Sequence, residues 1–324
     1  MILGIDGGNS KTDYFLFTNE GKLKNHIRAG TCSHERLVDG FSGSYRVIKE
    51  NLDVLLDGAK YKDIDVAVCG LAGVDTKQQK DALVAQLSQF GFGKLVVDND
   101  GFLGIKVGSE DGTGVCSING TGTVTVGIDG RGNRLQVGGI GDITGDEAGG
   151  AFITRLSVKR AYSSIYRCEK KTEFTEEVIK LLKLENKDEF LDAISGIYGK
   201  AISHTPYVKL VFDYAQKGDE VALEIVDYVS NSLAHSVVGC VNNLEFGNQL
   251  TVILAGSVWT KPKSDVLRDA FKGHVLRLTD KDVKYVVLEV PPAVGAVLWA
   301  MEIFKGSALT HEQRADIVKQ VSDM

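Results

Sequence analysis

Short apolar runs that end in glycine and polar residues recur along the chain. Residues 3–6 and 13–18 have the length and composition of buried strands, and residues 22–29 complete a three-stranded meander. Between the first two strands lies Gly7-Gly8-Asn9-Ser10-Lys11-Thr12, whose glycines leave backbone N–H groups open to an anion. The pattern indicates a turn that binds phosphate, with Asp6 placed to meet a metal ion. From these residues alone, an ordinary hairpin is an equal alternative.

A second stretch repeats this layout. The apolar strand 114–118 ends in Asn119-Gly120-Thr121-Gly122-Thr123, a second strand follows over 124–128, and a turn leads to a third strand over 133–137. Two copies of one strand–turn–strand–turn–strand unit indicate an internal repeat. The repeat favours phosphate binding over a plain turn at both Ser10 and Thr121.

Strands and helices alternate through the rest of the chain. Helices are predicted over residues 37–56, 76–90, 147–165, 176–199, 219–241, 291–304 and from 310 onward. Apolar residues at helical spacing mark those at 76–90 and 219–241, whereas 37–56 is polar and 176–199 is charged. Strands are expected at residues 65–69, 95–97, 250–254 and 283–288. Thr76 with Gln79 and Thr310 with Gln313 predict capping boxes, and Thr175 is a candidate cap for the helix after it. This alternation indicates α/β architecture.

Composition narrows the class of protein. The 324 residues are 43% hydrophobic and 25% charged, which is typical of a globular protein with two domains. The net charge of −6 argues against a nucleic-acid partner. The five cysteines are scattered, as in proteins of a reducing cytoplasm. No signal peptide or bilayer-spanning stretch is expected. We therefore expect a cytoplasmic protein without membrane contact.

Two phosphate-turn meanders and a third glycine turn near the C-terminus form the plan of the actin-like ATPases. More closely, the chain resembles the N-acetylglucosamine kinases and their relatives in the BadF/BadG/BcrA/BcrD ATPase family. The resemblance runs from Gly4 to about Ala300. It rests on ordered motifs at residues 6–12, 70–75, 99–100, 119–123, 138–147, 215–219, 255–259 and 294–296.

The resemblance implies an actin-like ATPase (ribonuclease H-like) fold, in which two similar α/β domains surround a nucleotide cleft. The first domain would span residues 1–107 and the second residues 108–324, with the last helix, 310–324, able to pack back on the first domain.

The resemblance also assigns roles at the matching positions. For ATP, the expected contacts are Gly8, Ser10, Lys11, Thr121, Ala215, Gly256 and Ser257, with Asp6 holding Mg²⁺ through water. Asp100 matches the catalytic base. For the sugar, the expected contacts are Ser33, His34, Asp100, Thr123, Gly139, Ile140, Gly141 and Asp146.

Some of these residues have plain structural alternatives. Asp100 could cap the helix that follows it, and Asp146 with Glu147 could be a capping pair at a helix start. His34 is undecided between loop polarity and a sugar contact. Asp98 is interpreted as a solvated loop carboxylate.

The implied function is phosphorylation of a small-molecule amino sugar, N-acetylglucosamine to its 6-phosphate, with ATP and Mg²⁺, by a homodimer. Two positions depart from the family pattern: Ser33 replaces the usual asparagine before histidine, and Ile140 replaces a tryptophan between glycines. Glucosamine and N-acetylmuramic acid are therefore alternative acceptors. An ATP-hydrolysing activator of a dehydratase is a further alternative, although it would need closely placed cysteines for an iron–sulfur cluster.

Overall fold

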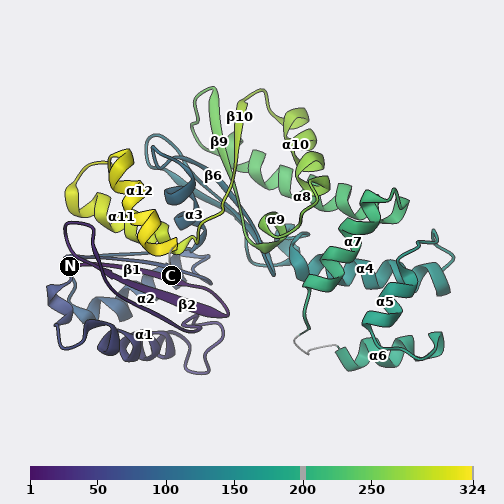
Figure 1. The fold of residues 1–324 in the computed structure, drawn as a ribbon, viewed down its shortest axis with the longest axis horizontal. Helices are drawn as coiled ribbons and strands as arrows, with labels where there is room; N and C mark the ends of the chain where they lie inside the picture. The colour runs from purple at the N-terminus through teal and green to yellow at the C-terminus, as the bar shows by residue number, and fades with distance from the viewer. Residues whose placement is uncertain (198–201, 323–324) are drawn as a thin grey trace.

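The computed structural model describes residues 1–197 and 202–322, which form two α/β halves (Figure 1). Each half is built on a five-stranded sheet, with strand orders β3-β2-β1-β4-β5 and β10-β9-β6-β7-β8. In each sheet the first three strands form an antiparallel meander, and two parallel strands are added beyond the first. The internal repeat in the sequence is therefore a repeat of topology.

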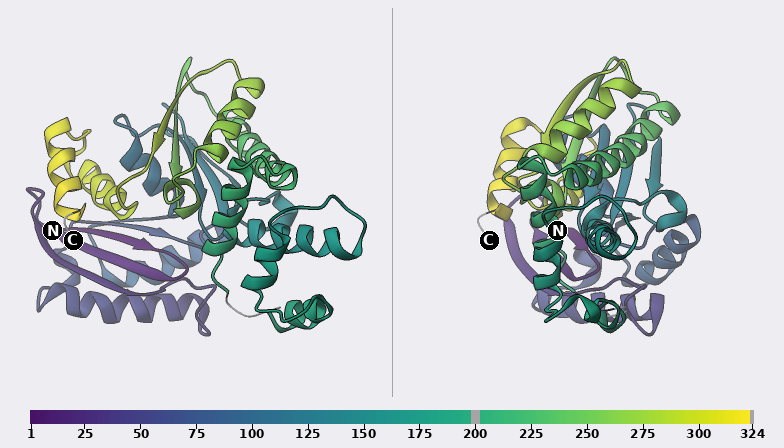
Figure 2. Two further views of the ribbon diagram at one scale, coloured as in Figure 1. Left: turned by 45° about the vertical axis from the view of Figure 1, so that its right-hand side comes forward. Right: turned by 90° about the vertical axis from the view of Figure 1, so that its right-hand side faces the viewer.

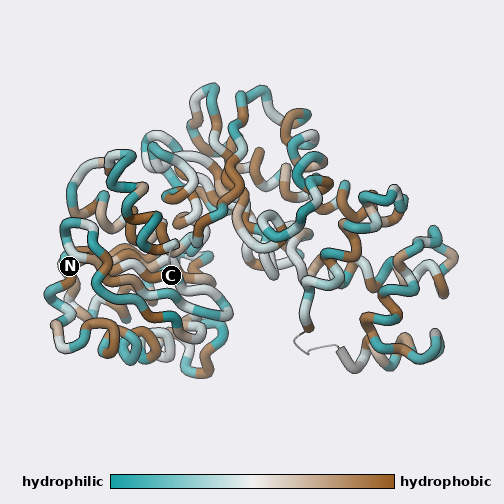
Figure 3. Tube along the Cα trace, viewed as in Figure 1, coloured by the Kyte–Doolittle hydropathy of each residue, from teal (hydrophilic) through white to brown (hydrophobic). Residues whose placement is uncertain are grey.

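The first sheet is covered on both faces. Its strands are β1 (Ile2–Gly7), β2 (Lys11–Phe17), β3 (Leu23–Gly30), β4 (Val66–Leu71) and β5 (Lys94–Asp98). Because side chains alternate across a strand, Leu3 and Ile5 join one core with α1 (Gly40–Leu56) and α2 (Lys77–Leu87). Ile2 faces the other core, which contains α11 (Ala293–Lys305) and α12 (His311–Ser322). In Figure 3 the apolar colour runs along these strands.

The second sheet carries most of the remaining helices. Its strands are β6 (Gly114–Asn119), β7 (Thr123–Ile128), β8 (Arg134–Gly138), β9 (Gln249–Ala255) and β10 (Asp282–Val287). One core contains residues of seven helices: α4 (Gly149–Tyr166), α5 (Thr175–Leu181), α6 (Phe190–Ile197), α7 (Thr205–Gln216), α8 (Glu220–Asn243), α9 (Ser257–Thr260) and α10 (Val266–Leu278). None of the described helices combines the length and the apolarity needed to cross a bilayer.

Two helices occupy the junction between the halves. The chain passes from the first sheet to the second through α3 (Gly101–Gly108) and returns to α11 after β10. The two helices pack closely, since a Cβ on Gly295 would lie 2.1 Å from the Leu103 carbonyl oxygen. One apolar core contains residues of both sheets and of both helices. Any rotation of one half against the other therefore has to be absorbed at this junction.

The last helix lies against the first half. The N–H of Leu23 donates to Gln320 Oε1 (2.8 Å), which ties α12 to the start of β3. Arg314 donates to the carbonyl oxygens of Lys106 (2.6 Å) and Ser109 (3.0 Å), at the carboxyl end of α3. The yellow helices beside the purple strands in Figure 2 show this placement. The C-terminal segment thus contacts both the first sheet and the junction.

Most predicted elements are present, and one predicted helix differs from the structure. The capping boxes at Thr76 and Thr310 are confirmed. The single helix expected after Thr175 is instead two helices, α5 and α6, and Thr175 is the first residue of α5 without a capping bond. Lys183 has φ of 58°, and a left-handed residue cannot continue a right-handed helix. Residues 198–199 of the predicted helix lie outside the described residues.

Candidate active site

The first of the two predicted phosphate turns, called the first phosphate turn below, connects β1 and β2. The Gly8 N–H donates to the Lys11 carbonyl (2.9 Å), and Thr31 Oγ1 donates to the Gly8 carbonyl (2.9 Å), so the turn is held from two sides. Lys11 Nζ lies 3.3 Å from Asp13 Oδ2. Ser10 is exposed and makes no hydrogen bond to another described residue. Its hydroxyl is therefore available to a ligand.

The second phosphate turn connects β6 and β7 and is fixed by the start of α4. The N–H groups of Gly150 and Ala151 donate to the carbonyl oxygens of Gly120 (2.8 Å) and Thr121 (2.9 Å). The Thr123 hydroxyl donates to a carbonyl oxygen of β6 (2.8 Å), whereas the Thr121 side chain is exposed. Thr121 is thus free to meet a ligand, and Thr123 stabilises the strand end.

A cavity of about 540 Å³ opens beside the second turn. Thr121 and Ser257, two of the predicted nucleotide contacts, line it together. Gly256 allows this approach, because its φ is 97° and a Cβ there would lie 2.6 Å from the Asn119 carbonyl oxygen. The cavity is therefore bounded by the second and third glycine turns of the sequence.

Helix α7 forms another wall of this cavity. Gln216 lines it, together with His204, which directly precedes α7. The predicted adenosine contact Ala215 is buried in the core and is not among the lining residues. Of the motif at residues 215–219, the neighbouring Gln216 is therefore the residue that reaches the cavity, and the adenosine contact stays a prediction. Nothing in the local sequence had marked His204.

Asp6 and Asp100 are a pair of half-buried carboxylates near the junction of the halves. Desolvation by the surrounding protein raises the pKa of Asp6 to about 7, and the charges of Asp100 and Asp13 add to the rise. Desolvation and the charge of Asp75 raise the pKa of Asp100 to about 6. Perturbed carboxylates of this kind are typical of functional sites.

The capping alternative for Asp100 receives no support. Asp100 occupies the position before α3, but its side chain makes no capping hydrogen bond. The side chain of Asn99 instead accepts the N–H of Gly101 (2.8 Å). The side chain of Asp100 therefore does not cap α3.

Asp75 is a residue to which the sequence analysis gave no role. Its Oδ1 accepts hydrogen bonds from Asn99 Nδ2 (3.0 Å) and from Gln136 Nε2 (2.6 Å) of β8, so it links the two halves. Desolvation raises its pKa, and the charges of Glu35 and Asp146 add to the rise. Its one signal in the sequence is its place in the motif at residues 70–75, just after a buried strand.

Asp146 shapes the predicted sugar loop, residues 138–146. Its Oδ2 accepts the N–H groups of Gly139 (2.8 Å) and Gly141 (2.6 Å) and the Thr144 hydroxyl (3.1 Å). This carboxylate is thus engaged by its own loop and does not cap α4, so the capping alternative is wrong. The Ile140 side chain is 61% exposed at the tip of the loop.

The predicted sugar contacts Ser33 and His34 adjoin the segment that ends in Asp75. Ser33 is buried, and its hydroxyl donates to the Ala72 carbonyl oxygen (3.4 Å). The His34 ring stacks on Phe41 with ring centres 4.4 Å apart. Desolvation lowers the pKa of His34, which keeps the ring neutral, although the charge of Asp75 acts in the opposite direction.

The interpretation of Asp98 as a solvated loop carboxylate is wrong. Asp98 is 6% exposed, and its Oδ2 lies 2.9 Å from Lys80 Nζ and 2.5 Å from Arg134 Nη1. The Arg134 guanidinium also lies over the Trp299 ring, 4.7 Å from its centre. The sequence alone led to the prediction of a solvated carboxylate because the basic partners of Asp98, Lys80 and Arg134, are distant along the chain.

The predicted residues thus gather in two places. Thr121 and Ser257 line the cavity, and Gly256 directly precedes Ser257. Asp6, Asp100, Asp75 and Asp146 form a row of carboxylates, in which each of the last three raises the pKa of the one before it. The row leads from the first phosphate turn to the predicted sugar loop.

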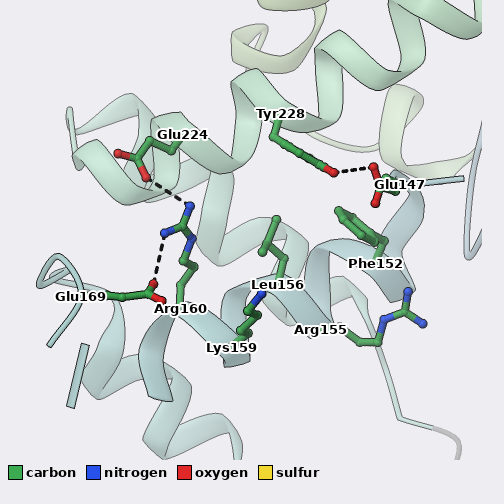
Figure 4. Close-up of a pocket in the computed structure, with 9 residues that line it drawn as sticks. All are labelled: Glu147, Phe152, Arg155, Leu156, Lys159, Arg160, Glu169, Glu224 and Tyr228. Carbon is green, nitrogen blue, oxygen red and sulfur yellow. Dashed lines mark hydrogen bonds and ion pairs between the residues drawn. The ribbon is translucent and has the colours of Figure 1, made fainter. Parts of the chain in front are cut away.

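A second cavity, of about 470 Å³, lies between α4 and α8. Figure 4 shows the Tyr228 hydroxyl bonded to Glu147, and Arg160 placed between Glu169 (3.3 Å) and Glu224 (3.2 Å). None of the predicted site residues lines this cavity. Its charged groups are largely occupied with one another, and it is bounded by no phosphate turn.

Comparison with known proteins decides the family. The model of the BadF/BadG/BcrA/BcrD ATPase family matches residues 3–300. The chain belongs to this family. Membership of an ATPase family implies the use of ATP.

Three known proteins illustrate the likeness. An N-acetylmuramic acid/N-acetylglucosamine kinase of Clostridium acetobutylicum is 28% identical over 316 residues, covering 92% of this chain and 97% of that protein. The structure of a candidate N-acetylglucosamine kinase from Chromobacterium violaceum matches with a TM-score of 0.68 at 21% identity, covering 92% and 98%. A ROK family glucokinase from Streptomyces griseus matches with a TM-score of 0.52 at 16% identity, covering 94% and 99%. These structures show the fold, which is the predicted two-domain actin-like fold.

Proposed function

We propose that this ATPase-family protein is an ATP-dependent kinase of an amino sugar, with N-acetylglucosamine as acceptor and its 6-hydroxyl as the position phosphorylated. The observation that carries the proposal is the perturbed pair Asp6 and Asp100 beside the first phosphate turn. The Clostridium acetobutylicum relative, a kinase of two amino sugars by its name, supports this class of acceptor.

The proposed chemistry divides between the turns and the carboxylates. Phosphoryl transfer requires neutralised phosphate charge and an aligned acceptor more than covalent help. Backbone N–H groups and the hydroxyls of Ser10 and Thr121 would bind the phosphates from the two turns. Asp6 would hold, through water, the Mg²⁺ that arrives with ATP, since Mg²⁺ prefers oxygen ligands and keeps several waters.

Asp100 would act as the general base. With a pKa of about 6 its carboxylate is mostly ionised at pH 7, yet basic enough to take a proton from the acceptor hydroxyl. As the acceptor oxygen forms its bond to the γ-phosphorus, the bond from that phosphorus to the β,γ-bridging oxygen breaks and ADP leaves. Because a hydroxyl is a weak nucleophile, removal of its proton in this step is worth roughly 10²- to 10⁴-fold in rate. Asp75 contributes by raising the basicity of Asp100 and by holding the segment that faces the sugar.

N-acetylmuramic acid is the second candidate acceptor. Ile140 is exposed at the tip of the loop, so no large aromatic wall limits the size of an acceptor there. The name of the Clostridium acetobutylicum relative includes this sugar. Glucosamine is a further alternative acceptor, because Ser33 and Ile140 both depart from the pattern of the N-acetylglucosamine kinases.

The domain arrangement is part of the proposal. We place the end of the first domain near Val107, in α3, with the second domain following. The packing of α12 on the start of β3 supports a return of the last helix to the first domain. A homodimer and a cytoplasmic location stay predictions of the sequence analysis.

ADP release in the presence of a sugar panel tests the function. We expect release with Mg·ATP and N-acetylglucosamine, less with N-acetylmuramic acid, glucosamine or glucose, and almost none without sugar. ATP hydrolysis that no sugar stimulates would favour the dehydratase activator. Absence of ATP turnover with every sugar would rule out the kinase.

A further inference from the structure

We propose that His204 is a ligand of the nucleotide ribose, and that its Nε2 accepts a hydrogen bond from one of the two ribose hydroxyls. This inference rests on the proposed function, because it takes ATP to be the ligand of the cavity beside the second phosphate turn. His204 lies outside the sequence motifs that resemble those of the family.

His204 stands next to the second phosphate turn. It lines the 540 Å³ cavity together with Thr121 and Ser257. Its Cβ lies 3.0 Å from the position that a Cβ on Gly150 would take, and the Gly150 N–H donates to the Gly120 carbonyl of the turn (2.8 Å). Only the Gly150 backbone thus separates the histidine from the turn.

The other end of the same cavity wall lies far from the turn. Gln216 lines the cavity 12 residues after His204, which corresponds to roughly 18 Å along α7. Val208 and Phe212 line the wall between them and offer an apolar surface to a base. With the phosphates at the turn, the ribose is the next group along the nucleotide and the base comes last. His204 is therefore placed for the ribose.

Thr154 determines which ring nitrogen of His204 is free. Thr154 Oγ1 donates its single hydrogen to the Gly150 carbonyl (2.7 Å), so it can only accept at its 3.2 Å contact with His204 Nδ1. The ring proton therefore resides on Nδ1. Desolvation lowers the pKa of His204, so the ring is neutral near pH 7 and Nε2 carries a lone pair.

Because the neutral Nε2 is a hydrogen-bond acceptor, it can bind only a part of the nucleotide that donates a hydrogen bond. Phosphate oxygens are acceptors as well, so a neutral Nε2 gains nothing from them. The ribose hydroxyls are donors, and they lie next to the phosphates. Nε2 makes no hydrogen bond with any other residue in the described part of the chain, so a hydroxyl would meet a free acceptor.

Deoxynucleotides provide the test. KM values for ATP, 2′-deoxy-ATP and 3′-deoxy-ATP are measured for the wild type, for His204→Ala and for the control His235→Ala. His235 is an exposed histidine on α8, bonded to the Asn231 carbonyl (2.9 Å) and absent from the cavity. We expect the wild type and the control to have a KM about 3- to 10-fold higher for one deoxynucleotide than for ATP. In His204→Ala that difference should disappear, with the sugar KM unchanged.

Other outcomes overturn the inference. If His204→Ala still has a KM for that deoxynucleotide as many times higher than for ATP as the wild type does, the inference is wrong, whether or not all three nucleotides bind more weakly. If the alanine variant does not fold, His204→Leu, which fills the ring volume without an acceptor, takes its place in the comparison. If the wild type neither binds nor turns over ATP, the proposed function fails, and that result is distinct from the failure of His204 alone.

Discussion

Arg134 of β8 forms an ion pair with Asp98 of β5 and thereby joins the edge strands of the two sheets. A second link lies nearby, where Gln136 of β8 donates to Asp75 of the first half (2.6 Å). Both links adjoin the start of α3, where Asp100 is placed. Closure of the predicted cleft around a sugar therefore has to act through these contacts.

Replacing Arg134 should weaken closure more than replacing the other cation on Asp98. Arg134→Met removes the contact between the halves, whereas Lys80→Met removes one within the first half, and the two side chains are 37% and 38% exposed. Each variant loses a charged hydrogen bond worth roughly 1.5–3 kcal/mol, and Arg134→Met also loses the contact with the Trp299 ring, so both should lower the melting temperature and Arg134→Met should lower it more. In X-ray scattering, only Arg134→Met should show reduced compaction with sugar and nucleotide. Equal compaction in both variants would contradict this role.

The phosphate turns predict a selective loss of ATP affinity. Ser10→Ala and Thr121→Ala each remove one hydrogen bond to a charged phosphate, so the KM for ATP should rise about tenfold or more. The sugar KM should change little. Ser88→Ala is the matched control, because its hydroxyl donates to the Val84 carbonyl at the end of α2 (2.6 Å). Unchanged ATP kinetics in both turn variants would remove the phosphate-turn interpretation.

In mild base, where Asp6 and Asp100 are ionised, the two carboxylates should lower the stability of the ligand-free protein. Their pKa values, about 7 and about 6, are above the 3.8 of an ordinary aspartate. The folded state thus holds these protons more tightly, and the contribution of these groups to stability rises as pH falls through 7 and 6 toward 3.8. Asp100→Asn should therefore raise the melting temperature at pH 8 by about 2–4 °C.

The pH dependence of that gain distinguishes the carboxylate from a general effect of the mutation. The gain should shrink toward pH 5, where Asp100 of the wild type is largely protonated. The exposed Asp269→Asn on α10 serves as the control and should show no comparable trend. A constant difference at both pH values would mean that desolvation of Asp100 is not the cause.

Local sequence patterns predicted most of the fold, but they did not predict contacts between residues that are far apart along the chain. Both meanders could be predicted, because a glycine turn between two apolar strands lies within a short stretch of chain. Arg134 lies 36 residues from Asp98, and Gln136 lies 61 residues from Asp75, so no local pattern indicates either contact. His204 escaped for the same reason, since its place depends on the packing of α7 against the start of α4. The helix break at Lys183 escaped because a charged run carries no stop signal there.

Phosphate transfer to N-acetylglucosamine, measured for the wild type and Asp100→Asn side by side, tests the central claim most directly. Mass spectrometry of the sugar should show a monophosphate formed by the wild type in step with ADP. Asparagine keeps the size but cannot take the proton, so turnover should fall by about 10²-fold or more while both KM values change little. Phosphorylated sugar at a similar rate in Asp100→Asn, or ADP from the wild type without any phosphorylated sugar, would contradict the account.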